Sequence, residues 1–165
     1  MKKFDVDQSE RYCVFQIGDE WFAFPSLAIR SVVPRPSLTQ VPYSDPVLRG
    51  MCHLQNEFLP VFSLRALVNV SQDATSAEEK QLMIMMGLQG TWGQSPWGLL
   101  IDRAVALVPL ETSISSYSSH EDNWSRVIVG SASYSNHVLQ VLDAKAIFQY
   151  VSNLLEMHWQ PAGQN

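Results

Sequence analysis

The feature of this sequence that most restricts its fold is an internal repeat without gaps, at an offset of 80 residues. Residues 47–68 align with residues 127–148, and six of the 22 aligned pairs are identical. Composition alone would give about one or two identities over that length. The chain is therefore predicted to contain two related halves. The identical pairs are Val47/Val127, Gly50/Gly130, Asn56/Asn136, Leu59/Leu139, Val61/Val141 and Ala66/Ala146.

Short apolar segments bounded by glycine and proline occur throughout both halves. "YCVFQIG", "WFAFP", "FLPVF", "LMIMMG" and "VLQVL" each have the length of a strand. A second match, at an offset of 76, aligns the segment from Trp21 with that from Trp97. Each half supplies about five strands, enough for a small barrel whose closure removes exposed edges. The prediction is a mainly β domain over residues 1–165, with one barrel at 11–70, a second at 81–150 and a polar connector between them.

The end of the chain has the pattern of an amphipathic helix. Asp143 is a residue type that caps helix N-termini, and apolar residues recur at helical spacing in "AKAIFQYVSNLLEMHW". We expect a helix over residues 143–159 whose apolar face covers the barrels, and the alternative is a face that binds a partner. The stripe consists of Ile147, Val151, Leu154, Leu155 and His158.

Charge and composition argue against several classes of protein. The net charge is −5, the pI is about 5.2, and Lys and Arg do not cluster along the sequence, so nucleic acid is not an expected partner. No run approaches the roughly 18 apolar residues of a membrane span, and the start "MKKFDVDQSE" lacks the apolar core of a signal peptide. Two cysteines are too few for a secreted disulfide framework. We expect a cytoplasmic protein with no direct membrane insertion.

Cys52 and His53 are the one pair of neighbours that suggests nucleophilic chemistry. A catalytic thiol needs an imidazole within hydrogen-bond reach, but adjacent side chains of a strand point to opposite faces. The repeat aligns Cys52 with Ala132 and His53 with Ser133, which predicts a buried cysteine and an exposed histidine. A thiol hydrolase using Cys52 remains the alternative.

Other catalytic and metal-binding patterns are missing from the sequence. The four histidines are scattered, and the phosphate-binding, dinucleotide-binding and hydrolase motifs do not occur. "HED" at residues 120–122 lies in a long polar tract, 111–126, where a solvated surface loop is the default interpretation. The methionines of residues 82–86 indicate either a buried strand or an adaptable binding patch. We expect no enzyme, no cofactor and no metal ion.

Three phrases of the chain resemble the CheW-like coupling family, the adaptors that link chemoreceptors to the histidine kinase CheA. They are "FQIGDEWFAFPSLAIRSVVP", "VPYSDPVLRGMCHLQNEFLPVFSLRALV", and "WGLLIDRAVALVPL", which carries Gly98 and Asp102. The second phrase contains the P-V-x-x-L-R pattern of the family at Pro60, Val61, Leu64 and Arg65. The resemblance covers about residues 12–148. It implies a fold of two packed five-stranded SH3-like barrels, a non-catalytic adaptor role in chemotaxis or pilus-motility signalling, and no cofactor.

The resemblance also implies where partners bind. The barrel surfaces would contact the regulatory domain of a CheA-like kinase, and the groove between the barrels would hold the cytoplasmic tip of a methyl-accepting chemoreceptor. A helix in a groove needs an apolar trough. The residues expected to line or back that trough are Val32, Val33, Leu99, Ile101 and Val105.

One hairpin departs from the pattern of the family. Where most relatives read N-L-R-G, this chain reads "HLQN", so that Gln55 replaces the arginine and Asn56 the glycine. Asn tolerates the left-handed turn conformation, so the hairpin is expected to form. The resemblance implies that the arginine of relatives faces a glutamate at the position of Ser31, so both charges are lost together. The alternative function is thus a CheW-fold interaction module with a different regulatory partner.

Overall fold

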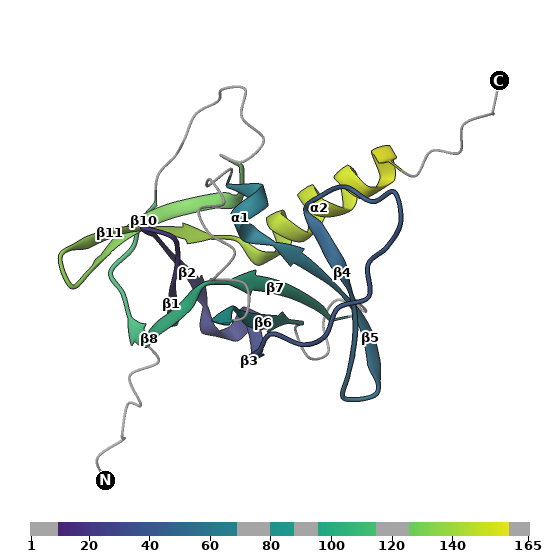
Figure 1. Ribbon diagram of the computed structural model, residues 1–165. Coiled ribbons are helices and arrows are strands. Elements are labelled where there is room, and N and C mark those ends of the chain that lie inside the picture. The colour runs from purple at the N-terminus through teal and green to yellow at the C-terminus, as the bar shows by residue number, and fades with distance from the viewer. Residues whose placement is uncertain (1–9, 69–79, 88–95, 115–125, 159–165) are drawn as a thin grey trace, which may run out of the picture.

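The computed structural model describes residues 10–68, 80–87, 96–114 and 126–158 (Figure 1). These residues form two curved sheets and a long C-terminal helix. Sheet A has the strand order β8-β1-β2-β11-β10-β9, and sheet B the order β3-β6-β7-β5-β4. The elements are β1 (Arg11–Ile17), β2 (Glu20–Pro25), the 3-10 helix η1 (Ser26–Ala28), β3 (Ile29–Pro34), β4 (Leu48–Leu54), β5 (Glu57–Ser63), α1 (Leu64–Leu67), β6 (Leu82–Met86), β7 (Trp97–Ile101), β8 (Arg103–Pro109), β9 (Ser113–Ile114), β10 (Ile128–Tyr134), β11 (His137–Leu142) and α2 (Ala144–His158).

Each sheet takes strands from both halves of the chain. Sheet A combines β1 and β2 with β8 to β11, and sheet B combines β3 to β5 with β6 and β7. The two sheets therefore do not correspond to the predicted barrels at residues 11–70 and 81–150. In the second half, Asp102 alone connects β7 to β8. Because one residue is too short for a hairpin loop, β8 cannot fold back on β7 and pairs with β1 instead.

The repeat nevertheless appears in the architecture. Under the two offsets, β1, β2 and β3 correspond to β6, β7 and β8, and the hairpin β4–β5 corresponds to β10–β11. The order β8-β1-β2-β11-β10 then has the same form as β3-β6-β7-β5-β4. The halves are therefore related as predicted, but each is divided between the sheets after its second strand: β1 and β2 join β8 to β11, and β6 and β7 join β3 to β5.

The two hairpins agree residue for residue. Gln55 and Asn56 have φ of 52° and 62°, and Ser135 and Asn136 have φ of 46° and 66°. Positive φ at both central residues is the requirement of a two-residue type I′ turn. Asn56 thus takes the left-handed conformation, as the sequence predicted, and the hairpin forms with its polar turn.

Helices α1 and α2 begin at equivalent caps. The Ser63 hydroxyl accepts a hydrogen bond from the Ala66 amide (3.2 Å), and the Asp143 carboxylate accepts one from Ala146 (3.3 Å). These contacts satisfy amides that the first helical turn leaves unpaired. Helix α1 stops after four residues, whereas α2 continues to His158, one residue short of the predicted end.

A shared apolar core joins the sheets and α2. Phe15, Phe22 and Phe24 from sheet A pack in the same cluster as Phe62 and Leu99 from sheet B. Separate clusters fill the concave sides, around Val14 and Leu139 in sheet A and around Leu59 and Met85 in sheet B.

Helix α2 packs on the shared core through its predicted stripe. Ile147 and Val151 are buried there, and Leu154 and Leu155 are half-buried against the same cluster. The ring of Phe148 lies 5.7 Å from that of buried Trp97. This confirms the prediction that the helix covers the β structure, as far as its side chains are described.

The hydrogen-bonded ladder of neither sheet returns from its last strand to its first within the described residues, so neither is a closed barrel. Each sheet is closed in part by the chain segment that follows its edge strand, β3 in sheet B and β8 in sheet A. Thr39 bridges to Met51 of β4, and Ser113 in β9 pairs with Ser131 of β10. The predicted class, mainly β with two SH3-like units and a C-terminal helix, is confirmed.

Gly50 allows this partial closure of sheet B. Its φ is +149°, and a Cβ added there would lie 2.6 Å from the carbonyl oxygen of Thr39. Next to Gly50, the backbones of Met51 and Thr39 form two hydrogen bonds with each other, each 2.8 Å long. A side chain at residue 50 would therefore separate the bridging segment from β4.

We predict that Gly50→Ala lowers the free energy of unfolding by about 2 kcal/mol, because the added methyl meets backbone that cannot move away cheaply. Urea unfolding followed by tryptophan fluorescence measures the change. Ser133→Ala, on the exposed face of the matched strand β10, is the control and should shift stability by less than about 0.5 kcal/mol. Equal effects of the two substitutions would contradict the role given to Gly50.

Candidate functional site

The predicted contact residues of β3 lie on the free edge of sheet B. Val32 is opposite Ile84 of the shared core and is 38% exposed. Val33 is half-buried and packs into the concave side of sheet B. Because facing residues in an antiparallel pair project to the same side, Val32 points along the face that turns toward sheet A. Of these two residues, Val32 is the one positioned to touch a partner.

The remaining predicted trough residues are less accessible. Leu99 and Ile101 have no exposed surface and belong to the shared core. Val105 in β8 is half-buried against the concave cluster of sheet A. These three side chains can back a partner site by holding its wall, but Leu99 and Ile101 cannot contact a partner in this conformation.

Leu107 is a surface residue that the sequence analysis missed. It lies in β8, opposite Cys13, and is 56% exposed. Cys13 is in turn opposite Phe24 of the shared core, so Leu107 also projects toward the space between the sheets. Val32 and Leu107 thus both lie on edge strands, β3 of sheet B and β8 of sheet A, and both face the space between the sheets. We call these two residues the inter-sheet margin. No sequence pattern singles out Leu107, because its exposure depends on β8 being an edge strand.

The departures at the β4–β5 hairpin are accompanied by a different ion pair. The Ser31 hydroxyl donates to the Met85 sulfur at 3.3 Å, and Gln55 and Asn56 are exposed in the turn. Beside them, Arg30 Nη1 lies 2.9 Å from Glu57 Oε2. The cation is on β3 and the carboxylate on the hairpin, the reverse of the polarity that the resemblance implies. This pair links the edge strand β3 to β5, which is not its neighbour in sheet B.

A second ion pair fastens the centre of the molecule. The Asp102 carboxylate, between β7 and β8, pairs with Arg65 of α1. The same carboxylate oxygen accepts a hydrogen bond from the Gly18 amide (2.7 Å) in the β1–β2 turn, and the other accepts one from Gln81 (3.3 Å). Arg35, which follows β3, donates to the Gln81 amide oxygen at 3.0 Å. Asp102 and Arg65 each lie in one of the sequence phrases that resemble the family. Their ion pair gives these two residues a structural role, because it joins α1 to the β7–β8 connection.

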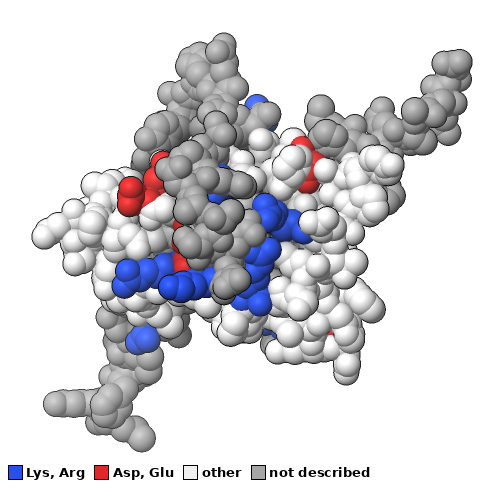
Figure 2. Space-filling view, viewed as in Figure 1, with Lys and Arg blue, Asp and Glu red and all other residues white. Residues whose placement is uncertain are grey.

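Positive charge gathers on one face in spite of the negative total. Figure 2 shows a band of Lys and Arg side chains across the middle of this face, over the region of β8, β6 and β3 in Figure 1. Lys and Arg form no cluster along the sequence, so only the fold brings them together. A partner that binds this face meets a basic surface.

Cys52 and His53 do not form a catalytic pair. Cys52 is opposite Leu59 and is buried in the concave cluster of sheet B, whereas His53 is exposed and contacts Phe58, with ring centroids 4.5 Å apart and planes tilted by 31°. Burial raises the pKa of the Cys52 thiol, and likewise that of Cys13. A raised pKa lowers the thiolate fraction at neutral pH, which is opposite to the requirement of a nucleophile. The predicted burial of Cys52 and exposure of His53 are confirmed.

Two further findings concern the described residues. They hold no group of three His, Cys, Asp or Glu side chains able to bind a metal ion. No helix among them is long and apolar enough to span a membrane. Residues 120–122, the "HED" tract, lie outside the described residues, as does most of the polar connector. The buried strand β6 confirms the structural interpretation of the methionines at residues 83, 85 and 86.

Comparison with known proteins agrees with this fold. The family model of the CheW-like domain matches residues 11–152, so the chain belongs to the CheW-like domain family. The solved structure of the scaffolding protein TtCheW from Thermoanaerobacter tengcongensis superposes with a TM-score of 0.71 at 15% sequence identity, covering 87% of this chain and 90% of that one. No curated protein sequence gives a significant match.

We predict that Asp102→Asn lowers the free energy of unfolding by about 2 kcal/mol, because it leaves a largely buried guanidinium without its carboxylate. The Arg65 and Asp102 side chains are 14% and 19% exposed, against 33% and 40% for Arg30 and Glu57. Glu57→Gln, in the more exposed pair, is the matched control and should cost less than about 1 kcal/mol. Thermal and urea unfolding check both variants. Similar losses at the two sites would show that the Asp102 network is not the tighter connection.

We also predict that both thiols react slowly in the folded protein. At pH 7.5 iodoacetamide should modify Cys13 and Cys52 at least about tenfold more slowly than it modifies free cysteine, because both are buried with raised pKa values. Mass spectrometry gives the rates, and unfolding in urea should restore them. Rapid modification of folded Cys52 would revive the thiol hydrolase alternative.

Proposed function

We propose that this protein is a non-catalytic adaptor that couples chemoreceptors to a CheA-type histidine kinase. The observation that carries the proposal is membership of the CheW-like domain family over residues 11–152. The relative described above is a scaffolding protein. In this proposal the protein acts at the cytoplasmic side of the membrane by binding both partners, without turning over a substrate.

The inter-sheet margin supports a site for a receptor tip. Val32 and Leu107 expose apolar surface on edge strands, and the buried side chains of Leu99 and Ile101 lie in the shared core between the sheets, where they form a rigid wall. An amphipathic helical hairpin needs such an apolar contact to bind. The basic band of Figure 2 adds a surface suited to acidic side chains on a partner.

We predict that Val32→Arg weakens binding of a receptor signalling fragment by about tenfold or more, because a charge replaces apolar surface at the contact. Tyr43→Arg is the matched control, since Tyr43 is 99% exposed in the segment between β3 and β4 and belongs to neither strand. Co-sedimentation with the receptor fragment and the CheA regulatory domain of the same organism measures both contacts. Binding of neither component by the unchanged protein would contradict the proposed function.

A second candidate, a CheW-fold module with a different regulatory partner, is favoured by the hairpin. Gln55 and Ser31 lack the charges that the resemblance implies, and the Arg30–Glu57 pair has the reverse polarity. A surface with altered charges binds less well to partners whose charges complement those that the resemblance implies at residues 31 and 55. The double variant Gln55→Arg with Ser31→Glu separates the candidates: it should strengthen kinase or receptor binding only if those contacts use this hairpin.

A further inference from the structure

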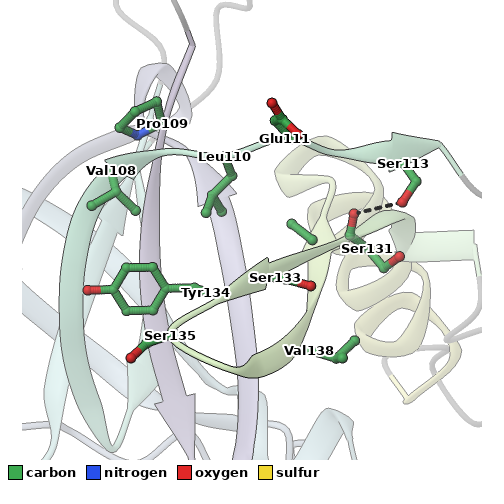
Figure 3. A pocket seen from close by; sticks show the side chains of 11 residues that line it. Val108, Pro109, Leu110, Glu111, Ser113, Ser131, Ser133, Tyr134, Ser135 and Val138 are labelled. Atoms are coloured by element: carbon green, nitrogen blue, oxygen red, sulfur yellow. Dashed lines mark hydrogen bonds between the residues drawn. The ribbon is translucent and has the colours of Figure 1, made fainter.

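A cavity opens at one edge of sheet A, away from the inter-sheet margin. It has a volume of about 820 Å³ and lies between residues 108–113 and the hairpin β10–β11 (Figure 3). Its walls include Val108, Leu110, Glu111, Ser133, Tyr134 and Val138. Val108 follows Leu107 in β8, and neighbouring strand residues point to opposite faces. The cavity therefore faces the other side of sheet A from the inter-sheet margin.

The cavity exists because two chain segments diverge. Ser113 and Ile114 of β9 pair with Ser131 and Gly130 of β10, and the Ser113 hydroxyl donates to the Ser131 carbonyl at 3.5 Å. Figure 3 shows the two segments separating from that point toward Leu110 and Tyr134. Within the described residues, no strand pairs with residues 132–134 on that side. Their outward backbone groups are a template for another extended segment.

The other half of the molecule shows what fills the matching place. In sheet B, Thr39 makes the bridge to Met51, the residue that the repeat aligns with Ser131. The preceding residue, Leu38, packs into the concave cluster of sheet B, and its Cβ would lie 3.2 Å from a Cβ at Gly50. An extended segment with a leucine thus occupies the position beside β4.

In sheet A the matching segment is β9, which pairs with β10 but brings other side chains. The residue before its bridge is Thr112 in place of Leu38. The cross-strand pair Ser133 and Val138 replaces the aromatic contact of His53 and Phe58. Thr112, Ser133 and Val138 are smaller than the residues at the matching positions of sheet B, which leaves room for the cavity.

The chemistry of the walls defines an occupant. The apolar side chains of Val108 and Leu110 suit one aliphatic side chain, and the backbone of residues 132–134 suits an extended peptide. Glu111 is the charged residue in the walls, and the other polar side chains there belong to serines and Tyr134. A carboxylate with no cation beside it in the walls favours a basic side chain on the occupant.

We propose that this cavity binds an extended peptide segment of a partner protein, which pairs with residues 132–134 of β10, inserts an aliphatic side chain beside Leu110 and places a Lys or Arg near Glu111. The site is separate from the proposed receptor contact and does not depend on it. It would give the adaptor a third attachment point, on the outer edge of sheet A.

The chain itself supplies the probe. The peptide of residues 35–41, RPSLTQV with blocked ends, contains the segment that fills sheet B and carries both an arginine and a leucine. Added to the full-length ¹⁵N-labelled protein up to 2 mM, it should shift the amide signals of residues 132–134 in a saturable manner. The same peptide with serine in place of its leucine should bind at least about tenfold more weakly.

Two variants of the protein separate the parts of the site. Glu111→Gln should weaken binding of the peptide by about two- to fivefold, whereas Glu20→Gln, at the exposed first residue of β2 and outside the walls, should leave binding unchanged. Thr112→Leu restores the residue type found in sheet B and should abolish binding while the protein keeps its thermal stability. Absence of shifts at residues 132–134 up to 2 mM would overturn the proposal. Equal binding of the serine peptide, or shifts confined to sheet B, would overturn it as well.

Discussion

The ion pair between Asp102 and Arg65 is the contact on which the arrangement of the two sheets depends. Asp102 follows β7 of sheet B and precedes β8 of sheet A, so its carboxylate lies where the chain passes from one sheet to the other. Through Gly18, Gln81 and Arg65 it also holds the β1–β2 turn, the start of β6 and helix α1. A single half-buried carboxylate thereby fixes the edges that carry Val32 and Leu107.

The parts of the fold that follow from local chemistry could be predicted from the sequence. The turn at Asn56, the cap at Asp143 and the helix after it each depend on a few neighbouring residues, and the repeat located both hairpins. The division of each half between the two sheets could not be predicted, because strand length and spacing do not specify which half a strand pairs with. The exposure of Leu107 and the Arg30–Glu57 pair depend on that division and were missed for the same reason.

Duplication gives the molecule two versions of each surface, and the sequence has made them different. The β4–β5 hairpin carries an aromatic contact and an ion pair to β3, whereas β10–β11 carries Ser133 and Val138 beside an open cavity. Membership of the CheW-like family specifies the shared framework, and these differences distinguish the two edges. The proposed contact at Val32 and the proposed peptide site thus lie on edges with different chemistry.

The division of each half between the two sheets has a consequence for how such a molecule can arise and be divided. Each sheet is complete only when both halves are present, which is the topology of a domain-swapped dimer joined into one polypeptide. An isolated half would leave β3 or β8 without its neighbour and would gain that neighbour by associating with a second copy of itself. The present chain is thus the covalent counterpart of a symmetric homodimer, a topology that leaves each half able to change its outer edge independently.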